Sequence, residues 1–371
     1  MDKLNVVFII GAGFSAEGGS PLISNFLEKA RKIYKKYNED DFIKNSVNDF
    51  NNVDKSIGEL HSMLAKAYLD LDNIESLFGA IEFGIMINKF GNKKSKEIEL
   101  LRDSLIKVIV TTIEYSIRYQ YSSQDLIICP QPVYMKYFTK LNSFKEYCNY
   151  SFITFNYDLI LEAGLQSLSM DFNYAFDNQL SNGIPLLKLH GSMNWFAKND
   201  KKIMTYPWPD KKSIADVFNP NVHPDISENF FIDRGPNEKY IHKFLPIGSE
   251  IIKSGKNPLI IPPTLNKFKY QEQLKNIWAK AASVLSEAEL IFIVGYSMPE
   301  TDVFFKYLYS LGIDSPKYLN KLVVINPDSN LQSKYAILSN SQYNFKKFNF
   351  ITGSFSQYID SIFKEIENLI G

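Results

Sequence analysis

The sequence predicts an α/β fold, in which a parallel sheet carries helices on both of its faces. Short runs of apolar, β-branched residues alternate with segments of helical spacing, first around Val6–Ile10 and again from Ser151 onward. The first apolar run ends at the turn Gly11-Ala12-Gly13, and a helical pattern begins beyond Pro21. A strand, a glycine turn and a helix in this order are typical of the first unit of a doubly wound sheet.

Composition restricts the class of protein. The chain has 371 residues, of which 45% are apolar and 22% charged, as in ordinary globular proteins. Its 41 basic and 41 acidic side chains cancel, so no overall field attracts nucleic acid or an anionic membrane. The two cysteines, Cys129 and Cys148, lack the spacing of a zinc module, and we expect no metal site. We recognise no signal peptide or membrane span and therefore expect a cytoplasmic protein.

The turn after the first strand is the first candidate site. Gly11-x-Gly13-x-x-Ala16 satisfies the dinucleotide-binding fingerprint. In that interpretation Gly11 permits a tight turn, and Gly13 lets the backbone approach a pyrophosphate at a helix N-terminus. The alternative is a glycine turn that serves only packing.

The next stretch departs from the pattern of a simple dehydrogenase. There, a second strand ending in an acidic residue arrives about 20 residues after the glycines. Here residues 38–60 are polar, and helical spacing follows over 74–85 and 98–117, so we predict an all-helical insertion over about 38–129. Glu75 and Glu82 lie one heptad apart on a face that we expect to be solvated; the alternative is that Glu75 lines a pocket.

The α/β alternation resumes after this insertion. Strands are predicted over 151–156, 185–190, 259–263 and 289–297, and a strand with its turn over 321–329. Helices are predicted over 159–165, 274–285, 298–308 and from 354 onward. Residues 193–257 are proline-rich and irregular, which predicts a lid or a small subdomain. The run Asn344–Phe348 is interpreted as an amphipathic edge strand rather than a nucleic-acid contact. The core would then comprise about 1–37 and 130–371 of one domain, 1–371.

Polar residues follow five of the predicted strands, where ligands bind in open α/β sheets. These segments are Gly11–Ser15, Asn156–Asp158, His190–Ser192, Gly295–Ser297 and Asn326–Asp328. Each has a local alternative. Asp158 can cap the following helix, His190 can be a core histidine, Ser297 with Glu300 forms a capping box, and Asn326-Pro327-Asp328 reads as a turn.

Taken in order, the five segments resemble the Sir2 superfamily. Gly11–Ser15 is similar to its phosphate loop, Thr154-Phe155-Asn156-Tyr157-Asp158 to its Asn-x-Asp motif, and Leu189-His190-Gly191-Ser192 to its catalytic histidine motif. Gly295-Tyr296-Ser297 resembles the second ribose-binding turn, and Ile325-Asn326 the adenosine-side motif. The resemblance runs from residue 6 to about 330, apart from the helical insertion and the proline-rich segment, and implies a Rossmann-like core.

The departures separate the chain from the protein-deacylase branch of that superfamily. The paired cysteines of its zinc module are absent, Phe155 stands where the deacylases carry Gln, and Leu22-Ile23-Ser24-Asn25 replaces their Asp-Phe-Arg. The sequence is more similar to the zinc-free, SIR2-like NAD hydrolases of bacterial antiphage defence, which carry helical insertions.

This resemblance implies that NAD⁺ is the substrate and that Asn156, His190 and Asp158 are catalytic. It implies that NAD⁺ is held by Gly11, Ala12, Gly13, Phe14, Ser15, Thr154, Gly295, Tyr296, Ser297, Asn326 and Asp328. A histidine suits the base because its ordinary pKa, about 6.5, lies near working pH. Nicotinamide leaves NAD⁺ as a neutral pyridine, so we expect hydrolysis to ADP-ribose and nicotinamide without a metal or a strong general acid.

Three rival functions remain open. One is an NAD-dependent deacylase, one is a non-catalytic sensor of NAD or ADP-ribose, and one is a flavin or nicotinamide oxidoreductase suggested by the glycine turn alone. Because a freely active NAD hydrolase would kill its own cell, we expect gating by a homo-oligomer, by a separate activator, or by a HerA-like ATPase partner. Since the final helix ends at Gly371, we expect no appended sensor domain.

Overall fold

The structure is a computed structural model that describes residues 2–62, 69–122, 126–177, 182–198, 202–209, 240–262, 271–299, 302–312, 319–339 and 348–371. The chain divides into two compact units, each assembled from separate stretches. The first comprises Met1–Gly18, Ile128–His190 and Gln271–Gly371, and the second Gly19–Ile127 and Gly191–Tyr270.

The first unit contains a seven-stranded sheet in which every neighbouring pair of strands is parallel. In sheet order its strands are β13 (Phe348–Thr352), β12 (Lys321–Asn326), β11 (Leu290–Val294), β1 (Leu4–Ile10), β4 (Cys148–Thr154), β6 (Ile184–Lys188) and β5 (Phe172–Asn173). The chain builds outward from β1 first on the β4 side and then on the β11 side. This reversal beside β1 is the place where doubly wound sheets bind ligands.

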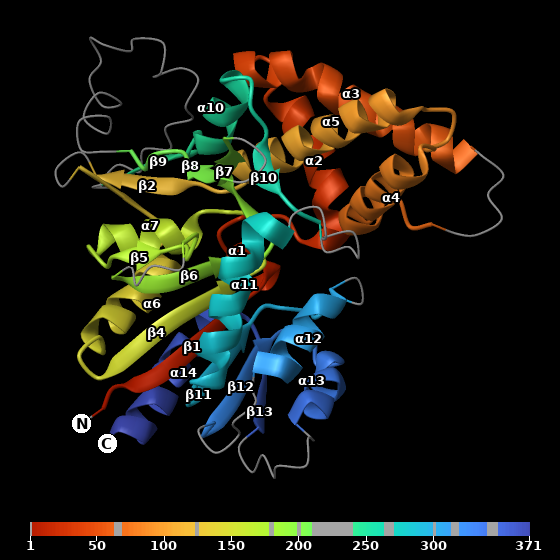
Figure 1. Cartoon of the computed structure of the whole chain (residues 1–371). Helices are drawn as coiled ribbons and strands as arrows, with labels where there is room; N and C mark the ends of the chain where they lie inside the picture. Colours follow the sequence, from red (N-terminus) through yellow and green to blue (C-terminus); the bar gives the residue numbers. More distant parts are fainter. Residues whose placement is uncertain are drawn as a thin grey trace. The chain divides into compact units, whose positions relative to one another are not determined.

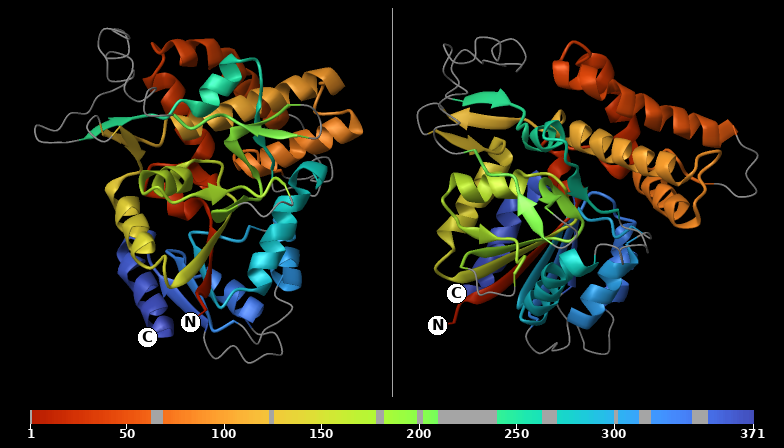
Figure 2. Two further views of the ribbon diagram at one scale, coloured as in Figure 1. Left: turned by 60° about the vertical axis from the view of Figure 1, so that its left-hand side comes forward. Right: turned by 45° about the horizontal axis from the view of Figure 1, so that its top comes forward.

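Helices cover both faces of this sheet (Figures 1 and 2). One face carries α6 (Pro132–Ser143), α7 (Ile160–Ser167) and α14 (Phe355–Ile370), and the other α11 (Gln271–Ser286), α12 (Val303–Gly312) and α13 (Leu331–Ser339). Because both faces are covered, the central strands are continuous apolar runs rather than alternating ones. Phe8 illustrates the core: its ring stacks on Phe152 and Phe292 at 5.4 and 5.1 Å. The predicted Rossmann-like α/β fold is confirmed.

The second unit is built from helices and short antiparallel strands. Within its described residues, the helices are η1 (Ile23–Asn25), α2 (Phe26–Lys36), α3 (Asp41–Ser62), α4 (Ile74–Ile87), α5 (Ser95–Glu114) and α10 (Ile247–Lys253). Strand β2 (Tyr119–Ser122) pairs with β9 (Tyr240–Lys243), and β7 (Gly191–Ala197) pairs with β8 (Ile203–Thr205) and β10 (Pro258–Ile260). Strand β3 (Ile127–Cys129) spans the boundary between the units.

Several elements differ from the sequence expectation. The short strands β2 and β3 lie in the range for which only helices were expected, and Glu82 is buried instead of solvated, with Glu75 half-buried. Within 193–257, strands β7, β8 and β9 and helix α10 replace the irregular chain in the described part. Residues 210–239, and residues 344–347 of the expected edge strand, lie outside the described residues.

Candidate functional site

The candidate site residues follow strands whose carboxyl ends are in register. Ile10 pairs with both Thr154 and Val294, Thr154 pairs with Lys188, and Val294 pairs with Ile325. The five strands β12, β11, β1, β4 and β6 therefore end at one edge of the sheet. The strands stop slightly earlier than expected: β4 ends at Thr154 rather than Asn156, and β6 at Lys188 rather than His190.

The glycine turn packs directly against the turn that follows β11. A Cβ on Gly11 would collide with the Cα of Tyr296, and one on Gly13 would lie 2.8 Å from the Cα of Gly295. The Gly13 N–H donates to the Gly295 carbonyl at 2.8 Å. Gly11 itself is extended, with φ −115°, so close packing rather than a special backbone conformation requires glycine here.

The residues after these glycines form a short helix, α1 (Ala12–Ala16), where a loop was expected. The Tyr134 hydroxyl from α6 holds it, because it donates to the Phe14 carbonyl and accepts the Gly18 N–H, both at 2.7 Å. Ser15 is buried and Ala16 ends the helix. The phosphate-binding role of residues 11–15 stays a prediction.

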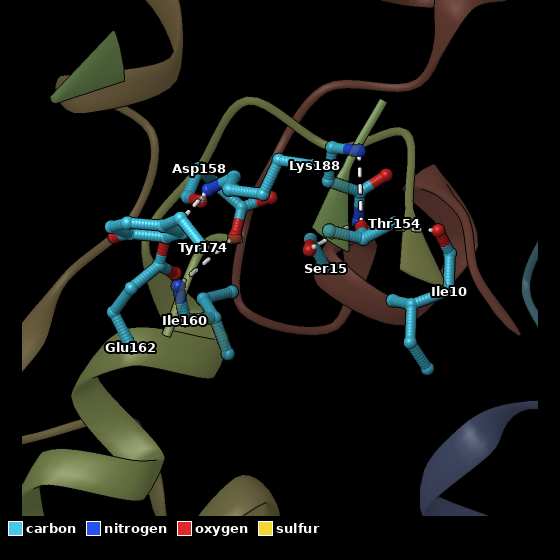
Figure 3. A network of polar contacts seen from close by, with 9 residues as sticks. Ile10, Ser15, Thr154, Asp158, Ile160, Glu162, Tyr174 and Lys188 are labelled. Atoms are coloured by element: carbon cyan, nitrogen blue, oxygen red, sulfur yellow. Dashed lines mark hydrogen bonds and ion pairs between the residues drawn. The ribbon is translucent and has the colours of Figure 1, made fainter. Parts of the chain in front are cut away.

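Asn156 is fixed by both hydrogens of its side-chain amide. The Nδ2 group donates to the Gly11 carbonyl at 2.9 Å and to the Ser15 Oγ at 3.0 Å. Thr154 helps to fix the backbone of Asn156, because its Oγ1 donates to the Ile10 carbonyl and accepts the Asn156 backbone N–H (Figure 3). The Oδ1 atom of Asn156 has no hydrogen-bond partner among the described residues. The side chain therefore presents an acceptor, which suits a hydroxyl group or a water molecule.

His190 lies buried in the turn between β6 and β7. Its Nε2 is 3.5 Å from the Oδ2 of Asp302, a carboxylate with no exposed surface, and the Tyr296 hydroxyl donates to the same oxygen at 2.8 Å. The edge of the imidazole meets Phe155, with ring centroids 5.0 Å apart, and Phe155 stacks on Tyr296. The structure thus gives His190 a buried acidic neighbour.

Asp158 belongs to a buried polar network on the other side of the loop (Figure 3). Its Oδ1 accepts the N–H of Ile160, the first residue of α7, at 3.1 Å, although Leu159 rather than Asp158 occupies the N-cap position. Lys188 donates to the Asp158 carbonyl at 2.5 Å and to Glu162 Oε1 at 2.8 Å, and Tyr174 donates to that same oxygen at 3.0 Å. Burial raises the pKa of the Glu162 carboxyl, and the Lys188 ammonium opposes that rise.

The Asn326 side chain holds the turn after β11 through hydrogen bonds. Its Nδ2 donates to the Tyr296 carbonyl at 3.1 Å, which also accepts the Tyr335 hydroxyl at 2.7 Å. Asn326 Oδ1 accepts the Asp328 N–H, and Asp328 is exposed in the expected turn. These contacts fix the backbone of Gly295 and Tyr296.

Ser297 does not have its expected capping role. It is exposed, and α12 begins at Val303 instead of Met298, so a cap at Ser297 would lie well before the helix. Glu300, its expected capping partner, lies outside the described residues. The glycine of the His190-Gly191-Ser192 motif is required locally, because Gly191 has φ +83° and packs against the Leu259 carbonyl.

Three polar residues at the site escaped the sequence interpretation: Lys188, Glu162 and Asp302. All three are buried, and Lys188 and Glu162 are each the single charged residue of an otherwise apolar or weakly polar stretch. A lone lysine in the strand run PLLKL and a lone glutamate in the helix run LILEAGL must find partners when buried. The need of a buried charge for a partner could therefore have identified Lys188 and Glu162 from the sequence.

The described part of the chain contains no cluster of three His, Cys, Asp or Glu side chains suited to a metal ion. Cys129 and Cys148 are both buried, and within the described ranges neither forms a disulfide. In the same described ranges, no helix is long and apolar enough to cross a membrane.

Comparison with known proteins gives a likeness of structure alone. No family model and no curated protein matches the chain. Solved structures to which it is similar are Sir2 proteins, including Sir2Tm bound to a propionylated peptide, with 10% identity and a TM-score of 0.41 over 98% of this chain and 93% of that one. A Sir2 homologue mutant in complex with ADP-ribose has 10% identity and a TM-score of 0.43, covering 98% and 92%. A Sir2 complex with a p53 peptide and NAD⁺ has 11% identity and a TM-score of 0.39, covering 98% and 93%.

Proposed function

We propose that this protein is an NAD⁺ hydrolase that cleaves the bond between nicotinamide and ribose. The observation that supports this most is the pairing, at one sheet edge, of an oriented acceptor on Asn156 with a buried histidine beside a carboxylate. The reaction converts NAD⁺ and water into ADP-ribose, nicotinamide and a proton. We also propose that the chain is one domain, 1–371, with a core of about 1–37 and 130–371, a helical insertion over about 38–129 and a lid or subdomain over about 193–257. The residues that we propose to hold NAD⁺ are Gly11, Ala12, Gly13, Phe14, Ser15, Thr154, Gly295, Tyr296, Ser297, Asn326 and Asp328.

The chemistry needs an electrophile held still and a water molecule that loses a proton. Nicotinamide departs with the electron pair of the C–N bond and becomes neutral, which leaves positive charge on the ribose. Asn156 Oδ1 accepts a hydrogen bond from the water or from a ribose hydroxyl, and His190 takes the proton of the attacking water. The Asp158 carboxylate stabilises the positive charge that develops on the ribose. His190 then returns its proton to solvent.

The decisive experiment measures nicotinamide release from NAD⁺ by the purified protein. We expect Asn156→Ala and His190→Ala to lower the rate at least about 100-fold, as loss of a general base or an orienting group does. Asn149→Ala and His61→Ala are matched controls, because both residues are exposed, and we expect them to leave the rate unchanged.

Other outcomes would establish one of the rivals. Release that occurs only with an acetylated lysine peptide would show an NAD-dependent deacylase. NAD⁺ binding without release, in every oligomeric fraction and with a co-expressed partner, would show a sensor. Hydride transfer or a bound yellow cofactor would show an oxidoreductase.

We further propose that the hydrolase acts in the cytoplasm as an antiphage effector, which depletes NAD⁺ in an infected cell. Such an activity must be off in a healthy cell. We propose that a homo-oligomer, a separate activator or a HerA-like ATPase supplies the control, and that neither a membrane nor direct nucleic-acid binding is involved.

A further inference from the structure

Asp302 stands at the start of α12 with its carboxylate turned toward His190. It has no exposed surface, and its Oδ2 lies 3.5 Å from His190 Nε2. The backbone around it is fixed, because its N–H donates to the Pro299 carbonyl and its carbonyl accepts the Phe305 N–H. A charge buried this completely is costly unless it is paired and hydrogen-bonded.

The aromatic residues around Asp302 hold both partners in place. Tyr296 donates its hydroxyl to Asp302 at 2.8 Å, while its ring stacks on Phe155 at a centroid distance of 4.4 Å. Phe155 in turn meets the His190 ring edge-on, at an interplanar angle of 67°. Phe305, one turn into α12, packs against both Phe155 and Tyr296. The imidazole and the carboxylate are thus fixed by one aromatic cluster.

We propose that Asp302 is a positioning residue that sets the tautomer of His190. Its carboxylate accepts the Nε2–H of the imidazole, which leaves Nδ1 unprotonated as the atom that takes a proton from water. This inference rests on the proposed function of the site. The distance of 3.5 Å is longer than an ideal N–H···O contact of about 2.9 Å, and such contacts tighten when substrate binds.

A carboxylate in this position acts in two ways. It holds the neutral ring in one tautomer and one orientation, and it stabilises the imidazolium that forms when Nδ1 gains the proton. Tyr296 keeps the carboxylate turned toward the ring. The proposed chain of polar contacts therefore runs from the Tyr296 hydroxyl to the Asp302 carboxylate, the His190 imidazole and the substrate. Asp302 acts on the substrate only through His190.

The tautomer can be measured without any enzymatic activity. The chain has 4 histidines, so long-range ¹H–¹⁵N spectra of the imidazoles are simple, and the loss of signals in His190→Gln assigns His190. We expect the Nε2–H tautomer in the wild-type protein and a switch toward Nδ1–H in Asp302→Asn, whose amide can donate a hydrogen to Nε2. Asp360→Asn is the matched control, since that carboxylate is exposed on α14, and we expect no change.

Kinetics give a second readout on the same variants. We expect Asp302→Asn to lower kcat for nicotinamide release by up to about 10⁴-fold, the loss seen when a catalytic histidine takes the wrong tautomer, with KM changed less than about threefold. Tyr296→Phe should keep the Nε2–H tautomer but lower kcat by a smaller factor. It also serves as the second variant if Asp302→Asn does not fold.

The outcomes separate the two proposals. An Nδ1–H tautomer in the wild-type protein, or a tautomer unchanged in folded Asp302→Asn, would overturn the role of Asp302 whatever reaction the protein performs. A tautomer switch without nicotinamide release in any preparation would uphold the role of Asp302 and reject the hydrolase.

Discussion

A lysine and a glutamate are buried together beside the loop that carries Asn156. Lys188 and Glu162 are each about 1% exposed at the side chain and lie 2.8 Å apart. The ammonium group also holds the Asp158 carbonyl, so one buried cation fixes the end of β6, the start of α7 and the loop after β4. Such a pair contributes little net stability, but removing one partner leaves the other charge uncompensated.

We therefore expect Lys188→Met to lower the free energy of unfolding by about 3–5 kcal/mol at pH 7, because it strands the Glu162 carboxylate in the core. Adding Glu162→Gln should recover part of that loss, since a neutral amide needs no counter-charge. Urea unfolding of the wild type, both single variants and the double variant measures the coupling. A double variant no more stable than Lys188→Met would contradict this account.

At the scale of elements, the second unit contains a buried carboxylate between two helix ends. Glu114 is the last residue of α5, and it accepts the Gly248 N–H at 2.9 Å and the Ser249 N–H at 3.1 Å in the first turn of α10. Burial is the main cause that raises the pKa of this carboxyl to about 8 from its usual 4.5, and the two backbone donors only partly oppose it. The folded protein therefore holds a proton here at neutral pH.

This proton makes stability depend on pH. Between about pH 4.5 and 8 the folded chain keeps the proton on Glu114 and the unfolded chain releases it, so stability falls as pH rises through that window and changes no further above it. The total is on the order of 5 kcal/mol. Glu114→Gln keeps an acceptor oxygen, and we expect it to match the wild type near pH 5 and to be more stable at pH 8.

Urea midpoints of both proteins across that range measure the difference. Other titrating groups are shared by the two proteins, so their contributions cancel. A stability difference that stays constant from pH 5 to pH 8 would show that Glu114 is not the group responsible.

Most secondary-structure elements could be predicted from the sequence because strands covered on both faces are continuous apolar runs. The ends of the strands were harder to place. A strand ends where its pairing with the neighbouring strand ends, as β6 does at Lys188, and the local composition does not show where that pairing ends. Strand β2 of the second unit pairs with β9, more than 100 residues away, and carries little local signal. The role of Gly13 was also hidden, because Gly295 is distant in sequence.

The candidate site was predictable to the extent that it lies at strand ends. The polar residues after β1, β4, β6, β11 and β12 were located in that way. Asp302 was not, because nothing local distinguishes a carboxylate that faces a histidine from one that caps a helix. Only the three-dimensional path of the chain after β11 brings it to His190.

At the scale of the whole molecule, we expect activity to depend on assembly. Size-exclusion chromatography with light scattering, followed by nicotinamide release from each fraction, tests this directly. If gating operates through a homo-oligomer, the specific activity should rise with the oligomeric fraction on increasing protein concentration. A lone monomer with full activity and no partner would reject gating.

The central position of β1 has a consequence for synthesis of the chain. This strand is made before both of its neighbours in the sheet, which begin only at Cys148 and at Leu290. During translation β1 therefore emerges before there is a strand with which it can pair. The edge that later pairs with β11 stays open until most of the chain has been made. The nascent chain thus carries an apolar strand with an unpaired edge for most of its synthesis, and such an edge is prone to aggregation until its partner strand arrives.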